Sequence, residues 1–224
     1  MPSRGAEPPN PPPERAASDA ARRSGRRLLG FDRSGPPPSQ TRPGEPWRPW
    51  TIPNAIGYAR LGLIPLFLAF EYASRDGVAT APAVCFFLAG AGDYLDGITA
   101  RITGQYSRLG AALDPLVDRL LVLAGAAACW SFELLPRWAL AVLLAREILM
   151  LLAGQQWVRR GRPITINWPG RIAVAPTMFG IWLELLGVHR VGEGFFFVGL
   201  ALAWIAAGVY IRDGLRETSG STSA

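Results

Sequence analysis

Six apolar stretches fill most of this 224-residue chain beyond its polar beginning, and they restrict the folds that it can adopt. Several of them approach the ~20 residues that a helix needs to span a bilayer. Short connections that carry glycine, proline or charged residues separate them. We therefore predict an all-α integral membrane protein with six transmembrane helices, placed approximately at residues 55–73, 78–100, 110–131, 136–157, 171–187 and 194–211.

The two ends of the chain differ in composition from this apolar part. Residues 1–46 are rich in Pro, Arg, Ser, Gly and Ala and show no apolar periodicity, which predicts a disordered tail. That segment holds no apolar run of the kind that a secretory signal needs. Trp47 and Trp50 follow, where aromatic anchors mark a membrane interface. We predict a membrane domain over 47–213 and a short disordered C-terminal tail over 214–224.

The arginines predict how the chain is oriented. The sequence contains no lysine, and nine of its arginines precede the first predicted span. Further arginines lie in the connections after the second and fourth spans and after the last span, whereas the other side holds only Arg75, Arg137 and Arg190. Positive charge favours the cytoplasmic side of a membrane. We therefore predict a multi-pass protein of the cell membrane with both termini in the cytoplasm, which agrees with an even number of spans.

Several classes of function are disfavoured by composition. The formal net charge is +6, but we find no nucleic-acid-binding motif, so we predict no nucleic-acid partner. Cys85 and Cys129 lie inside apolar runs, and we predict no disulfide between them. His189 is the single histidine and falls in a short predicted outer loop. A histidine-based triad near the acids, a phospholipase-D-type site and a histidine-rich zinc site are thereby excluded.

Four aspartates interrupt the apolar sequence with the spacing D-x2-D-G-x2-A-R-x8-G-x3-D-x3-D. Asp93 and Asp96 share one helix face, and so do Asp114 and Asp118. The residues at 105–110 can turn the chain, so the two faces can meet in a helical hairpin. Converging carboxylates repel one another unless cations lie between them, and oxygen ligands suit Mg²⁺ or Mn²⁺. We predict a divalent-metal site made by these four residues.

Small and basic residues surround the aspartates. Gly97 costs a helix up to ~1 kcal/mol relative to Ala, which indicates that a bulky group such as a phosphate approaches the backbone there. Ala100 and Gly110 are small for a similar reason, and Arg101 can pair with phosphate oxygens. Two alternatives stay open on the residues alone: a divalent-cation transporter that uses these acids, and a structural membrane protein in which they cap helices.

The motif resembles the signature of the CDP-alcohol phosphatidyltransferases, integral membrane enzymes of phospholipid synthesis. The signature covers 26 residues and is complete in this chain, and weaker similarity includes Thr51–Asn54, Arg60, Arg146–Glu147 and Gly170–Arg171. The resemblance implies a six-helix fold, often homodimeric, with two metal ions, Mg²⁺ or Mn²⁺, in a cavity that faces the cytoplasm. It implies transfer of a phosphatidyl group from CDP-diacylglycerol to an alcohol acceptor with release of CMP. The acyl chains of CDP-diacylglycerol would stay among the membrane lipids.

The resemblance also implies a role for each matching residue. Asp93 and Asp114 would touch both metals, Asp96 one of them, and Asp118 the other, with Asp118 also the general base. The remaining matching residues would bind CDP-diacylglycerol. Gly97, Arg101 and Ser107 would hold its diphosphate, Asn54 and Arg60 would contribute to the nucleotide pocket, and Ala100 and Gly110 would leave room for it.

The acceptor alcohol is less well marked. The segment Thr51–Asn54 and the run 108–118 resemble the branch that makes phosphatidylglycerophosphate or cardiolipin. Where that branch often has Gly-Lys-x-Lys-Thr, this chain has Gly170-Arg171-Ile-Ala-Val and lacks the second basic residue. A phosphomonoester favours more than one cation. We predict glycerol 3-phosphate first and phosphatidylglycerol second, with Arg146 and Arg171 as acceptor-binding residues. Arg146 and Glu147 form either a structural ion pair or part of the acceptor site.

Overall fold

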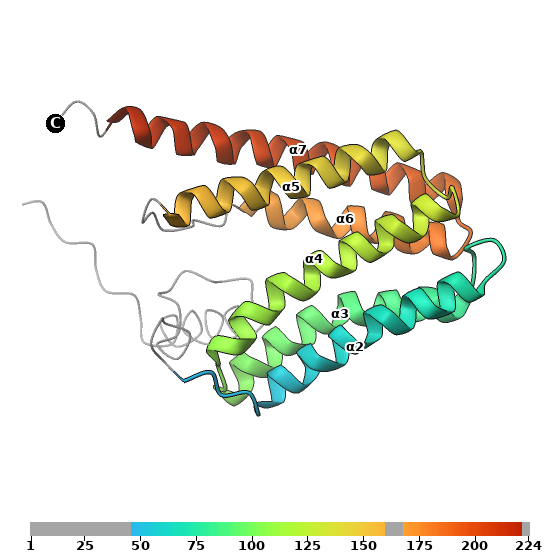
Figure 1. Cartoon of the computed structure of the whole chain (residues 1–224), viewed down its shortest axis with the longest axis horizontal. Coiled ribbons are helices and arrows are strands. Elements are labelled where there is room, and N and C mark those ends of the chain that lie inside the picture. The colour runs from blue at the N-terminus through green and yellow to red at the C-terminus, as the bar shows by residue number, and fades with distance from the viewer. Residues whose placement is uncertain (1–45, 160–167, 221–224) are drawn as a thin grey trace, which may run out of the picture.

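The computed structural model describes residues 46–159 and 168–220, with side chains described for 46–155 and 174–212. Six long helices and no strand occur in these ranges, which confirms the predicted all-α fold (Figure 1). The predicted tail over 1–46 lies, but for its last residue, outside the described residues. The helices are α2 Ile52–Ala73, α3 Thr80–Thr103, α4 Arg108–Ser131, α5 Arg137–Arg159, α6 Trp168–Leu185 and α7 His189–Gly220.

The last helix is longer than its apolar stretch. It begins at His189, which we had placed in an outer loop, and continues to Gly220, past the predicted domain end at residue 213. Most of the segment 214–224 therefore has helical backbone in this structure, and 221–224 lie outside the described residues. No proline follows residue 213, so the helical hydrogen bonding need not stop where the apolar residues end.

Among the described residues, three helices are long and apolar enough to cross a membrane by themselves. They are α2, the part of α5 at Arg137–Gln155 and the part of α7 at His189–Arg212. Helices α3 and α4 carry the aspartates of the motif, and α6 has a shorter apolar stretch at Val174–Leu185. The chain is thus a membrane protein in which three helices meet the criteria for a span and the other three pack beside them.

Local sequence determines where the helices around the motif begin and end. The Thr51 hydroxyl caps α2 by accepting from the Asn54 amide at 3.3 Å. Helix α3 ends at Gly104, whose φ of 66° lies in the left-handed region that glycine adopts easily. Ser107 then caps α4 by accepting from the Gly110 amide at 2.9 Å. The short turn between the two caps makes the helical hairpin that the sequence predicted.

The helices form two groups that meet through a shared apolar core. Figure 1 shows α2, α3 and α4 lying together, and α5, α6 and α7 lying together above them. Helix α2 packs against α3 and α4, helix α6 packs along α7, and contacts of α6 with α3 and α4 join the groups. Phe67, Phe86 and Leu121 are almost completely buried in this core. Cys85 and Cys129 are buried free thiols.

Candidate active site

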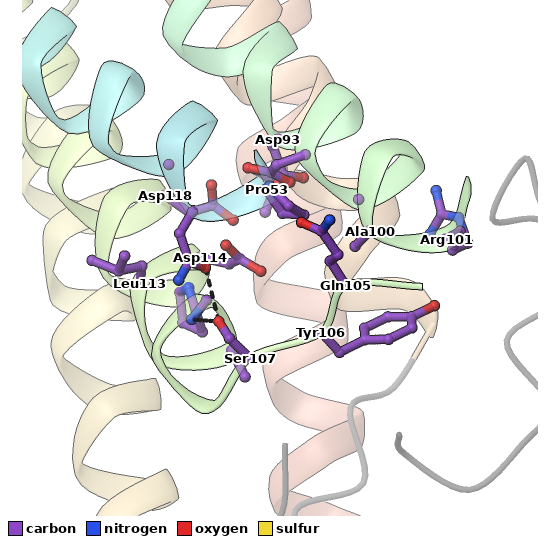
Figure 2. A pocket seen from close by; sticks show the side chains of 18 residues that line it. Pro53, Asp93, Ala100, Arg101, Gln105, Tyr106, Ser107, Leu113, Asp114 and Asp118 are labelled. Atoms are coloured by element: carbon purple, nitrogen blue, oxygen red, sulfur yellow. Dashed lines mark hydrogen bonds between the residues drawn. The ribbon is translucent and has the colours of Figure 1, made fainter. Parts of the chain in front are cut away.

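A cavity of about 590 Å³ lies where the end of α3, the start of α4 and the start of α2 come together (Figure 2). Its size is in the range of cavities that hold small-molecule ligands. Most of the residues that the sequence singled out line it. They are Asp93, Asp96, Asp114, Asp118, Asn54, Gly97, Ala100, Arg101, Ser107 and Gly110.

The four aspartates reach the cavity from the two arms of the hairpin. Asp93 and Asp96 come from α3, and Asp114 and Asp118 come from α4. Asp96 is buried, whereas about half of each Asp93 and Asp118 side chain is exposed, at 51% and 47%. Figure 2 shows Asp93, Asp114 and Asp118 around a common space, with Arg101 beyond Ala100 at its edge. Acceptor oxygens from two helices therefore converge here.

Arg60 contacts the motif aspartates but is not among the residues that line the cavity. Its Nη1 donates to Asp96 Oδ2 at 2.9 Å and to Asp93 Oδ1 at 3.4 Å, and its Nη2 donates to Asp118 Oδ1 at 2.6 Å. We had assigned Arg60 to the nucleotide pocket, but its guanidinium is directed at the acids. The sequence contained a clue that we missed: an arginine inside an apolar span needs buried acidic partners.

The four motif aspartates are the candidate ligands for a divalent metal. No group of three or more His, Cys, Asp or Glu side chains among the described residues has the arrangement of a metal site. The chemistry nevertheless fits, because all four acidic residues offer oxygen donors, which hard divalent cations prefer. A cationic group, the Arg60 guanidinium, already lies within 3.4 Å of oxygens from three of them. The cluster therefore requires positive charge, which Arg60 supplies in this structure.

Asn54 and Ser107 form a buried link between α2 and α4. The Ser107 hydroxyl donates to Asn54 Oδ1 at 2.8 Å. The Asn54 amide donates to the carbonyl oxygens of Arg48 and Pro49 at 2.9 and 3.1 Å. A Cβ on Gly110 would lie 2.7 Å from Asn54 Oδ1, so glycine is needed there for this link. The polar groups of Asn54 and Ser107 hold the cavity wall and the segment before α2 in place.

Gly97 and Arg101 lie together on the α3 side of the cavity. A Cβ on Gly97 would lie 3.6 Å from Arg101 Nη2, an ordinary van der Waals distance, so the protein itself does not require glycine at this position. The space that Gly97 leaves open is cavity space. Gln105 and Tyr106 also line the cavity, and Gln105 Oε1 accepts from the Ile52 amide at 3.1 Å. No feature of the sequence had singled out these two residues.

Arg146, one of the two predicted acceptor-binding arginines, is not among the residues that line this cavity. Arg146 lies in α5, is 8% exposed, and pairs with Glu147. The two residues form an ion pair, and Arg146 Nε has no hydrogen-bond partner among the described residues. A role of this pair in acceptor binding stays a prediction. Arg171 belongs to α6, but its side chain lies outside the described residues.

The described part of the chain is thus an all-helical fold in which four carboxylates surround one cavity, a donor set that suits hard divalent cations. The chain belongs to the CDP-alcohol phosphatidyltransferase family, whose model matches residues 50–211. This match includes the whole motif and all helices up to α7. The family is in general dependent on divalent metals.

Similar proteins are named either as cardiolipin synthases or as glycerol-3-phosphate phosphatidyltransferases. The chain is 39% identical over 143 residues to cardiolipin synthase (CMP-forming) of Streptomyces coelicolor, a match that covers 61% of this chain and 65% of that protein. It is 31% identical over 156 residues to CDP-diacylglycerol–glycerol-3-phosphate 3-phosphatidyltransferase of Bacillus subtilis, covering 62% and 75%. The enzyme of that name from Pectobacterium atrosepticum is 28% identical over 165 residues, covering 70% and 87%. The match thus spans less than two thirds of the Streptomyces protein.

Proposed function

We propose that this protein transfers a phosphatidyl group from CDP-diacylglycerol to an alcohol acceptor and releases CMP, as a step of phospholipid biosynthesis. The observation that carries the proposal is the meeting of the four motif aspartates at one cavity in a chain of this family. The names of the relatives support the same reaction class. A cation transporter using the same acids would not need the open surface at Gly97 or the adjacent Arg101.

Two divalent ions, Mg²⁺ or Mn²⁺, would be held by Asp93, Asp96, Asp114 and Asp118. When bound, these ions would neutralise the diphosphate and stabilise CMP as a leaving group. Asp118 is the proposed general base. Because its side chain is 47% exposed at the cavity, an acceptor hydroxyl there can reach it. Asp118 takes the hydroxyl proton, the acceptor oxygen bonds to the lipid-side phosphorus, and the bond from that phosphorus to the CMP oxygen breaks.

The substrate is held by the chain's own residues on the α3 side. Arg101 lies at the cavity edge, where its guanidinium can donate to diphosphate oxygens, and Ala100 and Gly97 leave space beside it. The cavity is also lined by Asn54, Ser107 and Gly110, which come from α2 and from the start of α4. Hydrogen bonds among these three residues fix this side of the cavity. The acyl chains stay in the bilayer beside the apolar helices.

Two acceptors are supported by specific observations. Phosphatidylglycerol, which would give cardiolipin, is favoured because Arg101 is the one cationic side chain among the described residues that line the cavity. The free phosphomonoester of glycerol 3-phosphate favours more cations than that. The 39% identical relative named cardiolipin synthase points the same way. Glycerol 3-phosphate, which the sequence placed first, becomes the second candidate and is supported by the relatives of 31% and 28% identity.

We further propose that the protein is a homodimer in the cell membrane with the cavity facing the cytoplasm. The placement of the arginines supports this orientation, because Arg101 near the end of α3 and Arg108 at the start of α4 flank the turn beside the cavity. Arg108 lies over the ring of Trp47 at 4.5 Å, as expected for a pair at a membrane interface. The dimer rests on the family resemblance.

An acceptor screen tests the reaction. Purified full-length protein in liposomes receives CDP-diacylglycerol and Mg²⁺ or Mn²⁺, with phosphatidylglycerol or glycerol 3-phosphate, and CMP and the lipid product are followed. We expect metal-dependent CMP release with phosphatidylglycerol and formation of cardiolipin. Release with glycerol 3-phosphate alone would instead assign the second candidate. Metal flux into liposomes without CMP release from folded protein would contradict the proposal and favour a transporter.

Replacing Gly97 by Ala should weaken substrate binding without harming the fold. Because the added Cβ meets Arg101 only at an ordinary distance and alanine favours a helix over glycine, we expect an unchanged or slightly higher Tm. The methyl group enters cavity space, so KM for CDP-diacylglycerol should rise by about tenfold, which corresponds to about 1.4 kcal/mol. Gly62→Ala is the matched control, since a Cβ there meets nothing within 4 Å and Gly62 does not line the cavity. An unchanged KM in Gly97→Ala would refute the role of Gly97.

A further inference from the structure

Arg60 makes an unusual set of contacts for a residue in the apolar helix α2. It is 1% exposed, and its Nε donates to the Ala89 carbonyl oxygen at 2.9 Å. Its two terminal nitrogens contact carboxylate oxygens of Asp93, Asp96 and Asp118 at 2.6 to 3.4 Å. All three nitrogens of one buried guanidinium are therefore used inside the protein, and three of the four motif aspartates share its charge.

Gly92 makes this placement of Arg60 sterically allowed. A Cβ at Gly92 would lie 2.6 Å from Arg60 Cγ and 2.7 Å from Arg60 Cδ, which is closer than such atoms can approach. The Arg60 side chain therefore crosses α3 through the space that this glycine leaves. Gly92 lies outside the motif, so its role concerns Arg60 rather than the cavity.

We propose that Arg60 is the built-in counter-cation of the acidic cluster, and that it competes with the divalent metal for the same carboxylates. In the metal-free protein it holds Asp93, Asp96 and Asp118 together against their mutual repulsion. A bound metal would draw on the same oxygens and so would weaken their contacts with Arg60. The inference rests on the proposed metal-dependent function, and it makes Arg60 a positioning residue rather than part of the nucleotide pocket.

Arg60 and a divalent metal would compete because both are positively charged and both would contact the same carboxylate oxygens. Removing a cation from among buried carboxylates leaves their charges uncompensated, which strongly destabilises a protein. A positive guanidinium that contacts the ligands of a metal also repels that metal, and the repulsion is large at separations of a few ångströms in a protein interior. Loss of Arg60 should thus weaken the metal-free fold and strengthen metal binding. A purely structural arginine would produce only the first effect.

The test measures metal binding without substrate. Full-length wild-type protein and Arg60→Gln are purified in detergent, Mn²⁺ is titrated, and free Mn²⁺ is read by electron paramagnetic resonance. Tm is measured in chelator and in saturating Mn²⁺. We expect Arg60→Gln to have a lower Tm in chelator, a larger rise in Tm with Mn²⁺, and a Kd for Mn²⁺ at least about tenfold lower. Arg137→Gln is the control, because Arg137 is an exposed arginine paired with Glu133 at 2.7 Å.

Two further variants keep the test decisive if Arg60→Gln does not fold. Gly92→Ala displaces the Arg60 side chain without removing a charge, and Arg60→Lys keeps the charge but cannot bridge three carboxylates. Both should lower the Tm in chelator, and Gly92→Ala should also lower the Kd for Mn²⁺. Equal Kd values in wild type and all folded variants would overturn the competition. Absence of Mn²⁺ binding in every folded protein would instead count against the proposed metal-dependent function.

Discussion

Replacing Asp118 by Asn is expected to abolish most turnover while leaving CDP-diacylglycerol binding largely intact. The amide has nearly the size of the carboxylate but cannot take the acceptor proton, and general-base catalysis contributes typically ~10²- to 10⁴-fold. We therefore expect kcat for CMP release to fall by about 10²-fold or more. Binding of labelled CDP-lipid to the purified variant measures the retained affinity.

A matched control separates catalysis from stability in this experiment. Asp76→Asn makes the same exchange in the loop between α2 and α3, where Asp76 Oδ1 accepts from the Val78 amide at 3.2 Å and an asparagine oxygen can do the same. Its turnover should equal that of the wild type. Near-normal CMP release by Asp118→Asn would remove Asp118 from the role of base. A large drop in Tm together with lost lipid binding would show instead that Asp118 acts in the fold, through Arg60.

Replacing Gly180 by Ala is expected to destabilise the fold strongly. A Cβ there would lie 2.5 Å from the Phe196 amide nitrogen and 2.8 Å from the Gly192 carbonyl oxygen. Both are backbone atoms of α7, which cannot move aside as the end of a side chain can. Small residues let membrane helices approach this closely. We expect a loss of about 1–3 kcal/mol or more in the free energy of unfolding, measured by denaturant titration in detergent.

Gly194→Ala is the matched control for this helix contact. Gly194 also lies in α7, but a Cβ there meets nothing within 4 Å. Because alanine favours a helix by roughly 0.5–1 kcal/mol over glycine, this variant should be unchanged or slightly more stable. Equal stabilities for Gly180→Ala and Gly194→Ala would mean that α6 and α7 do not pack as closely as the structure has them.

The helices and the cavity were predictable for different reasons. Apolar stretches near the length of a bilayer placed all six helices within a few residues, except that α7 begins at His189 and ends at Gly220. Hydropathy reports where apolar residues stop, whereas a helix continues as long as its backbone can hydrogen-bond. The aspartates were predictable as a group because spacings of three and four residues put side chains on one helix face. A single short turn then brings the two faces together.

The contacts of Arg60, Asn54 and Arg146 were not predictable in the same way. Arg60 is 33, 36 and 58 residues from its acidic partners, and Asn54 is 53 residues from Ser107. Helical periodicity says nothing about which helix lies beside which. Resemblance to a family placed these residues near the substrate, but the hydrogen bonds direct Arg60 to the acids and Asn54 to Ser107. Arg146 pairs with its neighbour Glu147, one of two alternatives that the sequence left open.

The sequence by itself determined the helical membrane class, the hairpin and the convergence of the four aspartates, because each depends on residues close together in the chain. Only the tertiary structure decided what neutralises those aspartates and which glycines are needed. Gly92 makes room for Arg60, Gly110 for Asn54 and Gly180 for the backbone of α7. Each of these contacts joins two helices, and the packing of helices depends on how all their surfaces fit at once.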